Sequence, residues 1–305
     1  MGPSRTARPE PDVKLTGTII DGNEPPRVAV PHISFSQASM YLRCSMQYYF
    51  RYVLGLKERP KLALGIGKGG HSALEFNSRH KIKTGADLAT SDLLDAASTF
   101  IDMETADLSK SDLNGEDKGE AKDRAIAAIQ VYRVRDAEAV HPAGVEVEFN
   151  LDLNVPNEEP IRIINGKIDL ITTDAGVEDY KFVGQARSQT EVDFSPQLTL
   201  YGKVFTTLTG KVPSKTGYRM FLPGSTRTPP DTRVIYRDPA LMTPQAQQSR
   251  FERLAFQFRQ VERGIRTGLF MPTDDPKVCS WCGFRERCQS SLVTDFEAAR
   301  LRGEN

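Results

Sequence analysis

Two aspartates and a lysine lie on either side of a short turn near the middle of the chain. Asp169 precedes the turn cluster at residues 173–176, and Asp179 and Lys181 follow it. β-branched residues on both sides of a turn that contains glycine are typical of a β-hairpin. If the turn is centred near residue 174, the two carboxylates fall opposite each other to within one residue. Side chains alternate along a strand, so Asp179 and Lys181 share a face.

This geometry would gather two carboxylates and one ammonium group on one patch. Two like charges held close together raise each other's pKa unless a cation lies between them. A hard divalent cation prefers oxygen ligands of this kind. The lysine beside it would orient a water molecule or stabilise negative charge that develops on a phosphate. The alternative is a solvated hairpin face with an incidental Asp–Lys pair, and this stretch alone leaves both interpretations open.

The four cysteines indicate a second centre. Cys279, Cys282 and Cys288 form a C-x2-C-x5-C cluster, and the fourth cysteine is Cys44. Without a secretion signal, such a set favours reduced thiols or metal ligands over disulfides. One remote and three clustered cysteines suit a four-iron, four-sulfur cluster held by four thiolates. Structural zinc, which normally takes two local pairs, is the alternative, and four unrelated core cysteines are a third.

Helices precede the hairpin in the predicted order of elements. Ser34 and Gln37 fit a capping box that begins a helix running to about residue 54 and carrying Cys44. Glycines at residues 65–70 lead into a helix at 69–81 that carries His71, and we expect them to let this helix pack closely. On that helix His71 is either a ligand or a solvent-facing residue. Two further helices are expected at residues 86–108 and 120–139.

Strands alternate with helices in the remainder of the chain. The strict alternation at residues 145–153 predicts a strand on which Glu148 is expected to face solvent. Gln197 and Tyr201, four residues apart, share one face of a predicted helix. The other elements expected here are strands at 161–171, 177–183, 217–222 and 232–236, and helices at 195–209 and 244–267.

Composition restricts the class of protein. The 305 residues carry 40 basic and 40 acidic side chains, so contact with nucleic acid requires a local basic groove rather than a global field. No run of 18 apolar residues and no secretory signal is found, so we expect no membrane span and a cytoplasmic location, in a bacterial cell or a phage-infected host cell. Residues 1–31 are expected to be a flexible arm and residues 291–305 a charged tail.

Taken together, the motifs resemble the RecB-like branch of the PD-(D/E)XK nucleases. Within that branch the resemblance is to CRISPR-associated exonucleases and to AddAB-type nuclease domains that carry an iron–sulfur cluster. The resemblance runs from about residue 34 to residue 288, and its specificity lies in the complete series in this order. That series is Cys44, Gly67, His71, Gly166-x-x-Asp169, Asp179-x-Lys181, Gln197-x-x-x-Tyr201, Cys279, Cys282 and Cys288.

The resemblance implies a role for each matching residue. His71, Asp169, Asp179 and the backbone carbonyl of Tyr180 would bind Mg²⁺ or Mn²⁺, and Lys181 would position the attacking water and stabilise the pentacovalent phosphate. The pair Gln197 and Tyr201 would lie beside the site, orienting the lysine or contacting the DNA backbone, and Cys44, Cys279, Cys282 and Cys288 would hold the iron–sulfur cluster. Relatives often carry Thr or Ser directly after the lysine, whereas Phe182 follows it here.

The resemblance also implies a fold and an activity. We expect an α/β restriction-endonuclease-like core with a mixed central sheet flanked by helices, and a helical region joined to the C-terminus by the four cysteines. Residues 32–290 would form one nuclease domain, with a helical part at 32–140, a core at 141–240, and a C-terminal helix and cysteine cluster at 241–290. The expected function is metal-dependent hydrolysis of DNA, by exonuclease action on single strands or duplex ends in recombination, repair or phage DNA processing. The expected partner is a helicase or recombinase, and the alternative function is a catalytically weak module that binds DNA or docks a helicase.

Overall fold

A mixed β-sheet forms the centre of the computed structural model, which describes residues 32–58, 61–113, 115–153 and 163–289. Within these ranges the sheet has six strands in the order β1-β3-β4-β5-β6, with β2 also paired to β3. The β1/β3 and β4/β5 pairs are parallel and the others antiparallel. The predicted arm (1–31) and tail (291–305) lie outside the described residues. The strands are β1 (Ile33–Ser34), β2 (Pro142–Leu151), β3 (Ile164–Thr172), β4 (Gly176–Phe182), β5 (Lys215–Leu222) and β6 (Asp231–Tyr236).

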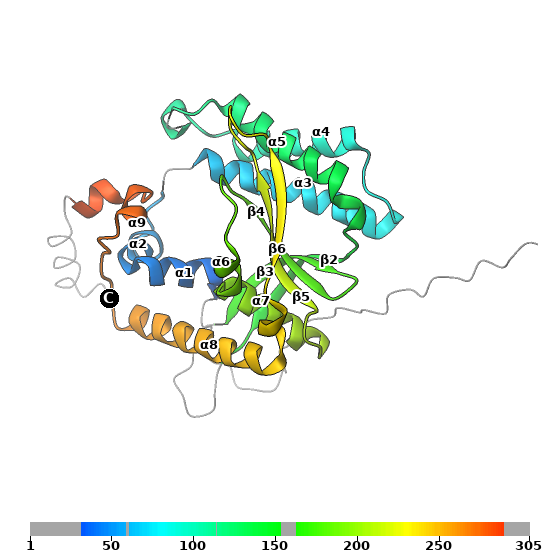
Figure 1. Ribbon diagram of the computed structural model, residues 1–305. Helices are drawn as coiled ribbons and strands as arrows, with labels where there is room; N and C mark the ends of the chain where they lie inside the picture. The colour runs from blue at the N-terminus through cyan, green and yellow to red at the C-terminus, as the bar shows by residue number, and fades with distance from the viewer. Residues whose placement is uncertain (1–31, 59–60, 114, 154–162, 290–305) are drawn as a thin grey trace, which may run out of the picture.

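Helices cover both faces of this sheet (Figure 1). One core joins the sheet to α3, α4 and α5, and a second joins it to α1, α7 and α8. The predicted mixed sheet flanked by helices is therefore confirmed. The longer helices are α1 (Phe35–Arg43), α3 (Leu62–Thr84), α4 (Thr90–Glu104), α5 (Lys118–Arg135), α7 (Pro196–Thr209) and α8 (Pro244–Arg266). Shorter ones are α2 (Ser45–Tyr48), α6 (Gln189–Asp193), α9 (Pro276–Ser280) and 3₁₀ turns at Lys110–Leu113, Ala137–Ala139 and Pro239–Met242.

The first helix begins as predicted but ends earlier. The capping box is present, because Ser34 N donates to Gln37 Oε1 (2.7 Å) and Gln37 N donates to Ser34 Oγ (3.2 Å). The helix then breaks at Cys44, whose backbone is extended, before α2 and a π-helical turn at Tyr49–Val53. The prediction of one continuous helix to residue 54 is wrong. Ring contacts between Tyr49 and Phe270 (centroids 5.0 Å apart) hold this segment against the C-terminal part of the chain, and such tertiary contacts override helix propensity.

The glycines at residues 65–70 lie inside α3, which begins at Leu62 rather than at residue 69. Close packing explains their presence in a helix interior, where glycine is unfavourable. A Cβ atom at Gly69 would lie 2.5 Å from the backbone of Ile101 in α4, and one at Gly70 would lie 2.2 Å from the ring of Phe182. The expected close approach is confirmed. In the described part of the chain, none of the helices is both long enough and apolar enough to cross a membrane.

Candidate active site

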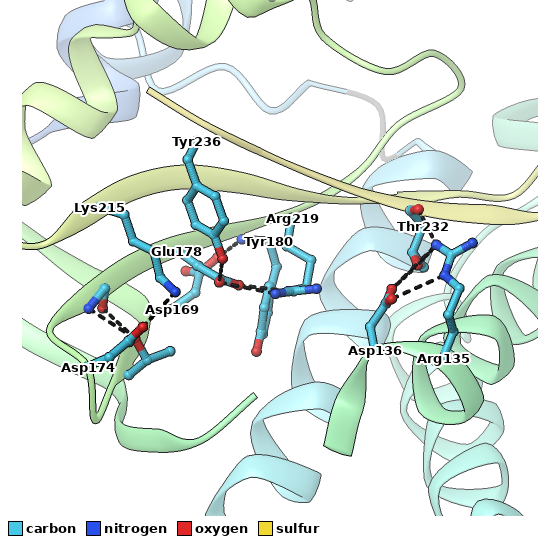
Figure 2. Close-up of polar contacts among 12 residues, drawn as sticks. Arg135, Asp136, Asp169, Asp174, Glu178, Tyr180, Lys215, Arg219, Thr232 and Tyr236 are labelled. Carbon is cyan, nitrogen blue, oxygen red and sulfur yellow. Dashed lines mark hydrogen bonds and ion pairs between the residues drawn. The ribbon is translucent and has the colours of Figure 1, made fainter. Parts of the chain in front are cut away.

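The predicted hairpin is formed by β3 and β4. Leu170 pairs with Glu178, and the register continued by one position places Asp169 opposite Asp179. At that point the ladder ends, and Oδ2 of Asp169 accepts a hydrogen bond from the backbone N–H of Tyr180 (2.7 Å; Figure 2). Asp179 is 1% exposed and Asp169 9% exposed. The alternative of a solvated hairpin face is therefore wrong.

Asp179 lies at the centre of a polar network on one face of β4. Nζ of Lys181 lies 2.6 Å from its Oδ2 atom. Oδ1 accepts a hydrogen bond from Nε2 of Gln197 in α7 (2.7 Å), and the same nitrogen lies 3.0 Å from the hydroxyl of Tyr201. Gln197 and Tyr201 thus share a helix face as predicted, and the group that Gln197 contacts is Asp179 rather than Lys181.

Three residues that could hold a metal ion lie beside this network. Nδ1 of His71 is 3.4 Å from Oδ2 of Asp169, and Glu146 completes a set whose donor atoms all lie within 4.8 Å of one another. One imidazole nitrogen and two carboxylates suit Mg²⁺ or Mn²⁺. Asp179 is outside this trio. The structure therefore brings His71 and Asp169 together as expected and adds Glu146, which the sequence analysis missed.

Glu146 reaches the trio because β2 is irregular at this residue. Its φ is +48°, a left-handed conformation that costs a residue other than glycine about 1–3 kcal/mol. On a regular strand Val145 and Val147 would share a face. Here Val145 packs in the core under α3–α5, whereas Val147 packs in the core under α7 and α8. Glu148 is exposed as predicted and pairs with Lys167 (3.2 Å).

The electrostatics of the site favour a bound cation. Burial, followed by the charge of Asp179, raises the pKa of Asp169 well above its ordinary value. Burial lowers the pKa of His71, which keeps the imidazole neutral, as a metal ligand must be. Burial alone would lower the pKa of Lys181, but the ion pair with Asp179 outweighs it and the pKa is raised. The lysine therefore stays charged beside Asp179.

A second buried network fixes the opposite face of β4. Figure 2 shows Glu178 between Arg219 and Tyr236. Nε and Nη2 of Arg219 donate to the two carboxylate oxygens of Glu178 (2.7 and 3.1 Å), and the hydroxyl of Tyr236 donates to the same carboxylate. This bidentate pair fixes how β4 is rotated about its axis. Because side chains alternate, it also directs Asp179 and Lys181 to the other face.

Substitution of Gly70 tests whether the close packing of α3 against β4, the strand that carries Lys181, is needed. The substitution Gly70→Ala would place a Cβ atom 2.2–2.7 Å from ring atoms of Phe182, beside His71. We expect it to lower the free energy of unfolding by about 1–3 kcal/mol, as overpacking does. It should also displace His71 and reduce activity. Chemical denaturation and a cleavage assay provide the two measurements.

Gly67 is the matched control, because a Cβ atom there meets nothing closer than 4.0 Å. Gly67→Ala should leave stability unchanged or raise it by up to about 1 kcal/mol through helix propensity. Adding Phe182→Leu to Gly70→Ala should restore part of the lost stability. If the two substitutions were additive in a double-mutant cycle, steric contact between these residues would not be the cause.

The four cysteines converge on one cavity far from the hairpin. Cys44, Cys279, Cys282 and Cys288 all line a space of about 170 Å³, and each is a half-buried free thiol. Burial raises the pKa of the thiols of Cys282 and Cys288. In Figure 1 the segment α1–α2 lies beside α9, so an early and a late part of the described chain meet here. Four thiols that line one cavity are compatible with a shared metal centre, and their role as ligands stays a prediction.

Comparisons with known proteins agree with this geometry at the level of the family. A search of the curated proteins finds no match. Among solved structures, one described as "Crystal structure of SSO0001" has 14% sequence identity, with 85% of this chain and 94% of that chain covered and a TM-score of 0.32. That likeness is too low to transfer residue roles. The family model described as "PD-(D/E)XK nuclease superfamily" matches residues 32–289. The chain, with its mixed sheet, acidic cluster and adjacent lysine, belongs to the PD-(D/E)XK nuclease superfamily.

Proposed function

We propose that this protein is a Mg²⁺- or Mn²⁺-dependent deoxyribonuclease that acts as an exonuclease on single-stranded DNA or duplex ends. The observation that supports this most is the ion pair between buried Asp179 and half-buried Lys181, directly beside His71, Glu146 and Asp169. A purely structural protein gains nothing by crowding three carboxylates, because each must be desolvated next to like charges.

The side chains divide the work between holding a cation and stabilising charge on the phosphate. His71, Glu146 and Asp169 would hold the divalent ion, with Asp179 and the carbonyl of Tyr180 as further proposed ligands. When bound, the ion supplies a water of lowered pKa and neutralises charge on the phosphate. Lys181 would donate a hydrogen bond from its ammonium group to the water or to the phosphate oxygen that gains negative charge.

Two neighbouring groups keep this lysine in place. Asp179 holds the ammonium group through the 2.6 Å ion pair, and Gln197 holds Asp179 through its other oxygen. The Gln197 amide is itself positioned by the Tyr201 hydroxyl, whose pKa is raised by burial, so it remains a neutral phenol. These successive contacts limit the rotamers that Lys181 can adopt. They therefore lower the entropic cost of positioning its ammonium group in each catalytic cycle.

The four-cysteine cavity is proposed to hold a four-iron, four-sulfur cluster. Four thiolates are the usual ligands of such a cluster. All four cysteines line one cavity of about 170 Å³, which supports a shared centre, and a single zinc ion is the alternative occupant. The cluster would join α1–α2 to α9. Roles in recombination, repair or phage DNA processing, with a helicase or recombinase as partner, belong to the same proposal.

Digestion of end-labelled DNA tests the function. Single-stranded and duplex substrates are incubated with the whole protein in Mn²⁺, Mg²⁺ or EDTA. We expect stepwise shortening from an end with either metal and no cleavage in EDTA, because the carboxylates need a cation to act on a phosphate. Tight binding without cleavage in both metals would favour the DNA-binding or helicase-docking module instead.

A further inference from the structure

Arg187 lies in the loop that leads from β4 to α6, six residues after Lys181. Its backbone N–H donates to the sulfur of Met220 in β5 (3.2 Å), which fixes the loop against the sheet. The side chain is 39% exposed. Arg187 therefore combines a fixed backbone with a partly accessible guanidinium group.

The Arg187 guanidinium and the Lys181 ammonium share one aromatic ring. The guanidinium carbon of Arg187 lies 5.1 Å from the ring centroid of Tyr218, and Nζ of Lys181 lies 5.5 Å from the same centroid. The ring is held by its hydroxyl, which lies 2.6 Å from Oγ of Ser195 and 3.4 Å from Oε1 of Gln197. Tyr218 thus contacts both the guanidinium group of Arg187 and the ammonium group of Lys181, to which the proposed function assigns the reacting phosphate.

The guanidinium group of Arg187 keeps a hydrogen-bond donor without a partner in the described part of the chain. Its Nε atom is buried and, among the described residues, has no hydrogen-bond partner. The nearest carboxylate is that of Glu191, with 4.0 Å between Nη1 and Oε1. The other oxygen of Glu191 already accepts hydrogen bonds from the N–H and hydroxyl of Ser188 (2.7 and 2.9 Å). Stacking on a ring orients a guanidinium group while leaving the N–H groups in its plane free.

We propose that Arg187 binds the phosphate next to the scissile one on the strand that is cut. This inference rests on the proposed function, since it assumes that the scissile phosphate lies at Lys181. A planar, oriented guanidinium group binds phosphate oxygens in a bidentate manner. The chain carries no net positive charge, so such local contacts must supply much of the attraction for DNA. Arg187 would then position the strand rather than take part in bond breaking.

The test measures how much the affinity for DNA falls when the arginine is removed, when one phosphate charge is removed, and when both are removed. Binding of fluorescent single-stranded oligonucleotides is measured in Ca²⁺, with one phosphate at a time replaced by a neutral methylphosphonate. Cleavage in Mn²⁺ is measured in parallel. Arg187→Ala and Arg187→Lys are compared with Arg124→Ala, a matched control of similar exposure (35%) that also has a glutamate four residues away.

We expect Arg187→Ala to weaken binding about 10- to 100-fold, as loss of a charge-assisted pair does. One methylphosphonate position should weaken binding of the unsubstituted protein by the same factor and have no further effect on Arg187→Ala. The affinity of Arg187→Lys for the oligonucleotide should lie between those of the unsubstituted protein and Arg187→Ala. Arg124→Ala should bind with the affinity of the unsubstituted protein. If the fold-loss of binding caused by Arg187→Ala multiplied with the fold-loss caused by the methylphosphonate at every position, Arg187 would not contact a phosphate. The inference would then be wrong. Absence of cleavage by the unsubstituted protein would overturn the proposed function, while the binding data would still decide the role of Arg187.

Discussion

Lys181→Met is expected to lower the rate constant of Mn²⁺-dependent DNA cleavage by about 10²- to 10³-fold. This is the usual loss when one group that stabilises charge in the transition state is removed. Methionine keeps most of the volume of the lysine side chain, so the surrounding packing should persist. The rate constant is measured under single-turnover conditions with saturating enzyme, which separates it from binding and product release.

Lys215→Met provides the matched control for this substitution. Lys215 also pairs with an aspartate, Asp174, with 2.7 Å between Nζ and Oδ2, and it lies on the neighbouring strand β5. Its pair lies outside the network of Asp179, so the rate constant should stay within about threefold of the unsubstituted value. Thermal unfolding of both variants checks that they fold. A Lys181→Met protein that folds and cleaves DNA at the unsubstituted rate would remove Lys181 from the mechanism.

Cys44→Ser is expected to abolish the proposed metal centre and to loosen the contact between the first helices and the C-terminal segment. Protein purified without oxygen should lose its absorption near 400 nm and its content of about four iron atoms per chain. Stability should fall by several kcal/mol, because the binding free energy of a structural metal centre contributes to folding. Iron and sulfide analysis, together with thermal unfolding, are the measurements.

Met46→Leu is the control, since Met46 lines the same cavity and the substitution conserves volume. It should keep both the absorption and the iron. Cys282→Ser should reproduce the effect of Cys44→Ser, because each thiol would be one of four ligands. Stoichiometric zinc in a colourless anaerobic preparation would show that the cavity holds zinc. Protein without any bound metal would refute the proposed centre.

Local signals in the sequence predicted those parts of the fold that are determined locally. The capping box at Ser34, the hairpin around Asp174 and the face shared by Gln197 and Tyr201 each depend on a few adjacent residues. The family motifs then associated His71 with a hairpin about one hundred residues later. The structure brings His71 and Asp169 to 3.4 Å, although their roles as ligands stay a prediction.

Glu146 was missed because its position depends on the partner strand. Glu146 and Glu148 are two residues apart, so both would face the same side of a regular strand. The sequence pattern therefore does not show which of them lies at the site. The pairing of Val145 with Leu170 places Glu146 opposite Asp169 by continuation of the register, and a positive φ turns it toward the site. Neither the register between distant strands nor the strained backbone can be read from a local pattern.

The break at Cys44 and the glycines of α3 were misjudged for a related reason. Apolar and aromatic residues around Cys44 have helical spacing, whereas contacts with Phe270 decide where the helix ends. Glycine has low helix propensity, which placed the predicted start of the helix at residue 69 instead of residue 62. The contact of α3 with Ile101 outweighs that preference, and it becomes visible only when two helices are placed together.

The meeting of α1–α2 with α9 has a consequence for synthesis on the ribosome. The two sides of the four-cysteine cavity are made roughly 230 residues apart, which at about 5–20 residues per second corresponds to a delay on the order of 10–50 s. During that time Cys44 and the rings beside it have no C-terminal partner, while the sheet and its covering helices can already assemble. The cavity is therefore completed only after the sheet, and until then the side chains of its early half lack the C-terminal residues that line it in the folded protein.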